Sequence, residues 1–302
     1  FGKELYLTFF KSYTEKVWGT ACDEISAEWG AQRIKGLSIL AALKHFFKSL
    51  LPKRGGDVAQ KDTETSLIER FLYPKLGPGQ MWDEVARRVI DLGGEIKTLT
   101  RVEGLETDGT RITSVRYRDL ETDEVHELSG DYFFSTMPMK ELVRGLEPAA
   151  PENVREISDG LVYRDFLTVG LLLDDLEIHE DAAGKKLIQD NWIYIQEPDV
   201  LVGRMQIFNN WSPYMVADSD KVWIGLEYFC NNTDDLWKMD DDALVDLAKR
   251  ELEHIEIIDA SKVSDAVVIK MPKTYPAYFG SYDRFDELRA YVDGFENLFL
   301  VG

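Results

Sequence analysis

One short stretch near residue 75 constrains the fold of this chain most strongly. Four helix- and strand-breaking residues fall within six positions: Pro74, Gly77, Pro78 and Gly79. They exclude a helix and a central strand at that point. An amphipathic pattern with helical spacing then runs from Trp82 to Ile90 and ends at Gly93-Gly94. The sequence therefore predicts a tight turn that leads directly into a helix.

The residues after this helix alternate polar and apolar side chains, which is typical of strands. The predicted extended segments are 95–100, 101–106, 112–118, 124–128 and 131–136. Segments 112–118 and 124–128 have the pattern of a β-ribbon, and Asp108-Gly109 marks a turn before it. The last segment is predicted to be a short buried strand that ends at Met137-Pro138.

This order of elements resembles the middle of flavoproteins of the amine oxidase and protoporphyrinogen oxidase superfamily, to which UDP-galactopyranose mutases are related. Residues 13–19, Tyr275-Pro276 and residues 297–302 share in the resemblance. The resemblance implies an α/β fold of mixed character. A partial Rossmann-like domain would bind FAD, and a second domain with an antiparallel sheet and helices would bind the substrate.

The resemblance also implies that the chain alternates between these two domains. Residues 1–65 are expected to be a helical part of the substrate domain, and residues 66–145 a segment of the FAD-binding domain. Residues 146–270 would form the antiparallel part of the substrate domain, with expected strands at 166–173, 192–195, 204–208 and 222–229 and a helix at 241–255. Residues 271–302 would return to the FAD-binding domain through an aromatic loop at 273–278, a helix at 285–292 and a buried strand at 298–302.

Composition narrows the classes of function. The chain has 302 residues with 44% hydrophobic content, enough for a packed core. A formal net charge of −20 argues against a nucleic-acid partner, which needs a basic face. The two cysteines lack the spacing of metal ligands and are expected to be free thiols of a cytoplasmic protein. No apolar run has membrane-spanning length, so we expect no membrane span. The four scattered His residues offer no metal cluster, the resemblance implies a small-molecule substrate, and the sequence leaves the oligomeric state open.

The two ends of the chain suggest a longer protein. Residue 1 is Phe, and no Gly-x-Gly-x-x-Gly occurs anywhere in the sequence. In a dinucleotide fold, Gly302 would open the turn into a helix N-terminus that receives the pyrophosphate. We therefore expect a central fragment that lacks both terminal FAD motifs, binds FAD poorly and is inactive by itself.

Six residues are cofactor candidates through the resemblance. In the resembled flavoproteins, a valine at the position of Val102 holds the adenine through its backbone N–H and C=O groups. Small polar residues and a proline after the buried strand lie beside the cofactor. The candidates are Arg101, Val102, Thr136, Met137, Pro138 and Gly302. The alternative interpretations are an ordinary strand valine and a strand that simply stops at its proline.

Six further residues are substrate candidates. Aromatic side chains offer apolar surface together with hydroxyl donors, and strand-borne arginines suit an anionic substrate. The candidates are Tyr275, Tyr278, Trp211, Tyr228, Arg164 and Arg204. Core packing of the aromatic residues and ordinary surface charge are the alternatives. No residue has the pattern of a dedicated acid or base, so catalytic residues stay unassigned.

Three functions remain open at this point. The first is an FAD-dependent oxidoreductase, in which hydride passes from a small organic substrate to the flavin. The second is a flavin-dependent isomerase of a nucleotide sugar, similar to UDP-galactopyranose mutase and without net redox change. The third is a binding or scaffold protein with a flavin fold that no longer binds flavin.

Overall fold

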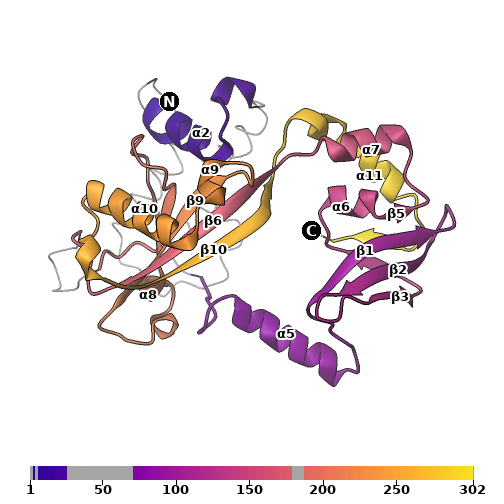
Figure 1. The fold of residues 1–302 in the computed structure, drawn as a ribbon, viewed down its shortest axis with the longest axis horizontal. Helices are drawn as coiled ribbons and strands as arrows, with labels where there is room; N and C mark the ends of the chain where they lie inside the picture. The colour runs from indigo at the N-terminus through magenta and orange to yellow at the C-terminus, as the bar shows by residue number, and fades with distance from the viewer. Residues whose placement is uncertain (1–2, 4–5, 26–70, 179–186, 302) are drawn as a thin grey trace, which may run out of the picture. The chain divides into compact units, whose positions relative to one another are not determined.

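The structure is a computed structural model that describes residues 3, 6–25, 71–178 and 187–301 (Figure 1). The chain divides into two compact units. Unit 1 comprises residues 1–85, 167–229 and 238–269, and unit 2 comprises residues 86–166, 230–237 and 270–302. The predicted mixed α/β class is confirmed, because helices and several sheets are present. Most of the expected helical block, 26–65, lies outside the described residues.

Unit 2 contains a four-stranded sheet with the order β3-β2-β1-β5. Its strands are β1 (Thr100–Thr107), β2 (Ile112–Asp119), β3 (Val125–Ser129) and β5 (Leu146–Glu147). β1, β2 and β3 pair antiparallel, which confirms the predicted ribbon, and β5 is parallel to β1. The expected strand at 95–100 is wrong. Leu99 has φ 52°, a left-handed conformation that interrupts an extended chain immediately before β1.

A smaller parallel sheet joins two distant parts of the sequence. β4 (Phe133–Ser135) pairs with β11 (Leu298–Leu300), so Phe133 lies opposite Leu298 and Leu300 opposite Ser135. The prediction that this strand is buried is wrong for one face of β4. Phe133 packs against the core, whereas Phe134 is 69% exposed and stacks on Phe299 across the strand pair. One face of β4 is therefore packed against the core of unit 2, and the other face is exposed.

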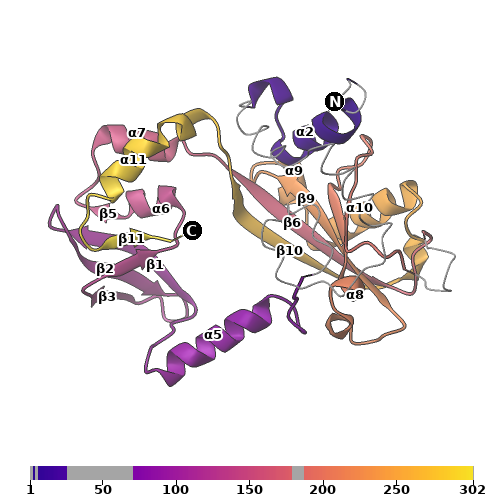
Figure 2. The same cartoon turned by 180° about the vertical axis from the view of Figure 1, so that it is seen from behind.

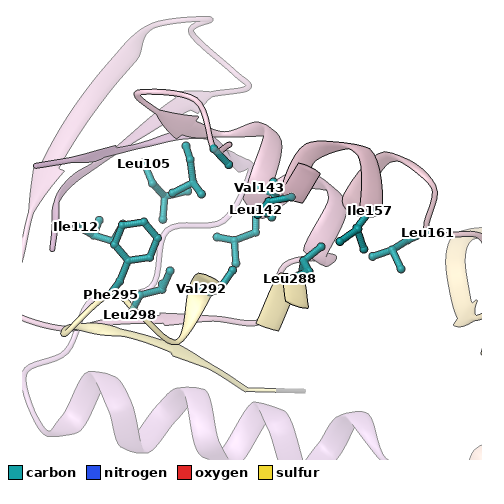
Figure 3. Close-up of a cluster of buried hydrophobic side chains, with 13 residues drawn as sticks. Leu105, Ile112, Leu142, Val143, Ile157, Leu161, Leu288, Val292, Phe295 and Leu298 are labelled. Atoms are coloured by element: carbon teal, nitrogen blue, oxygen red, sulfur yellow. The ribbon is translucent and has the colours of Figure 1, made fainter. Parts of the chain in front are cut away.

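Helices cover one side of these sheets and close the core of unit 2 (Figures 1 and 2). They are α6 (Met139–Arg144), α7 (Glu152–Asp159) and α11 (Phe285–Val292), and the short η6 (Gly280–Arg284) precedes α11. The predicted helix at 285–292 is thus confirmed. Figure 3 shows the core between sheet and helices, where Leu105, Ile112, Leu142, Leu288 and Val292 gather.

Asn297 ties the two sheets of unit 2 together. Its side chain is 1% exposed and lies just before β11. The amide oxygen accepts the backbone N–H of Ile112 at 2.8 Å, and the amide nitrogen donates to the carbonyls of Ile112 at 2.9 Å and Asp131 at 3.2 Å. One side chain therefore satisfies three backbone groups that belong to the start of β2 and the approach to β4.

A five-stranded sheet of order β10-β6-β9-β8-β7 fills most of unit 1, and its strands β6 and β10 also contribute residues to unit 2. The strands are β6 (Tyr163–Leu173), β7 (Trp192–Tyr194), β8 (Arg204–Ile207), β9 (Val222–Cys230) and β10 (Val263–Pro276). β7, β8 and β9 pair antiparallel, as predicted. The expected aromatic loop at 273–278 is wrong in part, because β10 continues through Tyr275 despite an irregularity at Lys273, where φ is 57°.

The other helical segments flank this sheet or connect the units. They are η1 (Tyr6–Lys11, a π-helical segment), α2 (Ser12–Trp18), η2 (Cys22–Glu24), α5 (Gly79–Asp91), α8 (Phe208–Trp211), η4 (Pro213–Met215), α9 (Asp235–Lys238), α10 (Asp241–His254) and η5 (Ala260–Lys262). The Asp240 carboxylate accepts the N–H of Ala243 at 2.8 Å, so an aspartate caps α10, which confirms the helix expected at 241–255.

The turn before α5 is present and rests on the segment after β8. Gly77 has φ 87°, which a residue with a side chain adopts only with strain. The Ser212 hydroxyl donates to the carbonyl of Lys75 at 2.7 Å. The predicted turn into a helix is therefore confirmed, and the side chain of Ser212, between α8 and η4, is hydrogen-bonded to it.

Candidate functional site

The first candidate region is the outer side of β1. β2 pairs with β1 from Thr100 to Thr107, but β5 joins the opposite side only at Leu105 and Glu106. Among the described residues, no strand pairs with that opposite side beside Arg101 and Val102, and both side chains are exposed. A strand edge of this kind can offer one backbone donor and one acceptor to a planar heterocycle.

The second candidate region is the carboxyl end of the parallel pair β4–β11. The N–H of Val301 donates to the carbonyl of Ser135 at 3.0 Å, so both strands end at the same edge. Thr136 is exposed there, and the N–H of Met137 donates to the Ser135 hydroxyl at 3.3 Å. Pro138 then starts α6. Gly302, the last predicted cofactor residue, lies outside the described residues.

The third candidate region lies in unit 1, around Arg204. In the register of the sheet, Arg204 lies opposite Tyr194 on one side and Glu227 on the other, so the three side chains share one face. The guanidinium carbon is 4.7 Å from the Trp192 ring centroid and 4.8 Å from that of Phe229. Arg204 is 8% exposed and Glu227 is 2% exposed. The predicted anion-binding arginine is therefore a buried, stacked cation.

Glu227 is the carboxylate partner of this arginine. It forms an ion pair with the Arg204 guanidinium and accepts a hydrogen bond from the Gln206 amide. Burial raises the pKa of Glu227, while Arg204 and Gln206 oppose that shift. An arginine that is paired in this way presents a neutral group rather than a net positive charge.

Trp211 and Tyr228, the other predicted substrate residues of unit 1, lie in different environments. The Trp211 ring packs against Tyr73 at 5.2 Å and Phe71 at 5.6 Å between ring centroids, next to the turn that precedes α5. Tyr228 is 1% exposed and alternates along β9 with Glu227, so it faces the opposite side of the sheet. Burial, with the nearby Glu251 carboxylate, raises the pKa of Tyr228 well above its ordinary value. Tyr228 is a core residue in this structure.

Arg164, in unit 2, belongs to a buried polar cluster. Its guanidinium lies 4.0 Å from the Asp234 carboxylate, and burial lowers its pKa. The neighbouring Asp165 accepts hydrogen bonds from the backbone N–H groups of Asn232 and Lys273, the latter at 2.7 Å. Cys230 completes the cluster, and burial raises its pKa to about 11. The cluster joins β6, β10 and the segment after β9, and its thiol is protonated at neutral pH.

Tyr275 and Tyr278 lie close together in sequence but differ in exposure. Tyr275 is half-buried and packs edge-on against Phe166, with ring centroids 6.1 Å apart. Tyr278 is 43% exposed and packs edge-on against Tyr282 at 5.0 Å. Between them, the N–H of Ala277 donates to the carbonyl of Val162 at 2.9 Å. Tyr278 is thus the more accessible of the two.

Sequence reasoning missed Glu227, Gln206 and Trp192, which surround Arg204. Each occupies an alternate position of an expected strand, so the period of two could have placed them on one face. The sequence did not show which residues of different strands lie opposite one another, because turn geometry and packing set the register.

A β-meander beside a parallel strand pair, together with a largely antiparallel sheet, defines the mixed α/β class of this chain. Solved structures share this fold. A reduced UDP-galactopyranose mutase matches with a TM-score of 0.71 and 17% identity, over 99% of this chain and 59% of that one. A putative protoporphyrinogen oxidase from Exiguobacterium sp. 255-15 matches with a TM-score of 0.52 and 16% identity, over 73% of this chain and 45% of that one.

An oxidoreductase from Methanosarcina mazei also matches, with a TM-score of 0.51 and 12% identity, over 75% of this chain and 49% of that one. The chain therefore spans less than two thirds of each of these three proteins. No protein-family model and no curated protein matches it. At these identities the likeness is one of fold.

Two negative findings apply to the described part of the chain. Its helices include none that is long and apolar enough to cross a membrane. Its His, Cys, Asp and Glu residues include no group of three or more that could hold a metal ion.

Proposed function

We propose that this chain is part of an FAD-dependent oxidoreductase of the amine oxidase and protoporphyrinogen oxidase type. The observation that carries the proposal is the common end of β4 and β11, where Val301 bonds to Ser135 at 3.0 Å. In α/β sheets, dinucleotides bind outside the carboxyl ends of parallel strands. The fold neighbours, which include two oxidoreductases by name or description, support the same class.

The residues present fit part of FAD. The outer side of β1 at Arg101 and Val102 suits the adenine, and the edge at Thr136, Met137 and Pro138 suits the region near the ring system. Bound FAD would supply the hydride acceptor. A pyrophosphate needs a glycine turn at a helix N-terminus, and Arg101, Val102, Thr136, Met137 and Pro138 supply none. The chain alone should then bind FAD weakly and be inactive.

We place a small organic substrate against Tyr278 and Tyr275 of unit 2. The sheet face of unit 1 that carries Arg204 is a separate candidate surface. Trp211 stays a candidate because its ring is only half-buried. Tyr228 lies in the core and Arg164 in a buried polar cluster, so we do not include these two residues in the proposed substrate site. The residues that remain would orient the substrate and exclude water, and no proton transfer is assigned to any of them.

A second candidate is a flavin-dependent isomerase of a nucleotide sugar. One observation favours it: the UDP-galactopyranose mutase structure matches 99% of this chain with a TM-score of 0.71, whereas the protoporphyrinogen oxidase matches 73% with 0.52. In this reading, Arg204 would lie near a diphosphate and would have to exchange its Glu227 partner for it.

Anaerobic spectroscopy of the complete protein separates the two candidates. We expect the purified protein to retain flavin and an organic amine or porphyrinogen to bleach its visible absorbance, because hydride reduces the ring. The control is the same titration with UDP-galactose. If the nucleotide sugar turns over only after chemical reduction of the flavin, the isomerase becomes the supported function and the oxidoreductase proposal is wrong. A complete protein without flavin would contradict both.

A further inference from the structure

Residues 13–19, which carry part of the resemblance, have a specific place in the structure. Tyr13 and Lys16 lie one helical turn apart on α2 and therefore face the same side. The Tyr13 ring packs edge-on against Tyr194 of β7, with centroids 4.7 Å apart. The Lys16 ammonium donates to the carbonyls of Ile195 at 3.3 Å, Glu197 at 3.0 Å and Val202 at 3.0 Å. An ammonium has three N–H donors, so this loop takes all of them.

Glu251 of α10 holds the same loop from another side. Its two carboxylate oxygens accept the backbone N–H groups of Leu201 at 2.5 Å and Val202 at 3.0 Å. Glu251 is 8% exposed. Two charged side chains from two helices therefore fix the loop 195–203 through its backbone groups, and the Asp199 side chain adds a contact to His254 of α10 at 2.5 Å.

This loop connects the two strands that build the Arg204 region. β7 carries Trp192, and β8 begins with Arg204. The N–H of Gly203 donates to the carbonyl of Glu227 at 2.9 Å, and a Cβ on Gly203 would lie 2.7 Å from the Phe229 ring. Because the chain approaches its neighbours this closely, a displacement of the loop would displace the stack of Trp192, Arg204 and Phe229.

We propose that Lys16 is a positioning residue that holds the β7–β8 hairpin and thereby keeps Arg204 between Trp192 and Phe229. Its functional meaning rests on the proposed role of Arg204 near the substrate, but its test needs neither substrate nor flavin. The titratable groups that face Lys16 are Glu251, Glu197 and Asp199, and they oppose the lowering of the Lys16 pKa by burial.

The test compares variants of the protein labelled with 5-fluorotryptophan. The fluorine signal of Trp192 is identified by its loss in Trp192→Phe. In Lys16→Met this signal should shift or broaden, because the loop loses its hydrogen bonds to a charged donor. For the same reason, the amide hydrogen of Gly203 should exchange with solvent about tenfold faster. Lys16→Arg should restore most of both effects, because it keeps the charge. Lys11→Met is the matched control, since Lys11 has a 44% exposed side chain and lies 3.8 Å from Glu15.

The Trp237 signal, from unit 2, serves as the internal reference. An unchanged Trp192 signal in folded Lys16→Met would overturn the proposal. A change of equal size at Trp237 would also overturn it, because a general loss of structure would then be the cause. If Lys16→Met does not fold, Lys16→Gln keeps donors without the charge, and the same comparison applies. Absence of flavin from the complete protein would affect the proposed function and leave this result standing.

Discussion

Replacing Asn297 by Ala should lower the free energy of unfolding by about 3–5 kcal/mol, since each buried polar group left without a partner costs about 1–3 kcal/mol. The side chain is 1% exposed, and its loss removes the partner of the N–H and C=O groups of Ile112, whereas the carbonyl of exposed Asp131 keeps the Arg111 guanidinium at 3.4 Å. Urea unfolding followed by circular dichroism measures the change, and the midpoint should fall without a change in the slope.

Two variants control this experiment. Asn297→Asp keeps the acceptor for Ile112 but places a buried carboxylate opposite two carbonyl oxygens, so at neutral pH its loss should be at least as large as that of Asn297→Ala. Glu296→Ala removes a 65% exposed carboxylate that pairs with Arg111 at 2.9 Å, and it should cost less than about 1 kcal/mol. If Asn297→Ala were as mild as Glu296→Ala, Asn297 would not be the link between the two sheets.

The Arg204–Glu227 pair should behave as a coupled unit. Glu227→Ala should destabilise unit 1 by about 3–5 kcal/mol, because it leaves a buried guanidinium without its carboxylate. The double variant Arg204→Met, Glu227→Leu should recover most of that loss, since apolar groups of similar volume need no partner. Equilibrium unfolding of the wild type, Arg204→Met, Glu227→Leu and the double variant gives the coupling energy.

The matched control is Arg116→Met, whose guanidinium belongs to a 38% exposed side chain and pairs with Glu106 at 2.9 Å. Its loss should stay within about 1 kcal/mol. A double variant at positions 204 and 227 that costs as much as the two single changes added together would show that the pair is not coupled.

Local patterns predicted most of the elements correctly. The amphipathic stretch before Gly93 forms α5, the helix expected at 241–255 forms α10, and the predicted strand segments form β2, β3, β8 and β9. These features depend on residues close together in sequence, which is why periodicity and capping chemistry find them. The family resemblance, rather than periodicity, pointed to the pairing of distant segments that β4 and β11 show.

Features that depend on tertiary contacts were harder to predict. Arg204 was expected near an anionic substrate, and the sequence did not show that cross-strand register also gives it Glu227 as a partner. Tyr228 was expected near the substrate, but it occupies the core face of β9. Phe134 was expected to be buried, but one face of β4 is exposed. In each case the strand was found and the environment of its side chains was not, because burial depends on what the rest of the fold places against each face.

The central claim is that the outer side of β1 and the common end of β4 and β11 form an FAD site. Backbone amide NMR of this chain, titrated with excess FAD and with UMP as the control nucleotide, tests that claim directly. We predict weak binding in which FAD, and not UMP, shifts the amide signals of Val102, Thr136 and Met137. Shifts confined to other residues, or none at saturating FAD, would contradict the account.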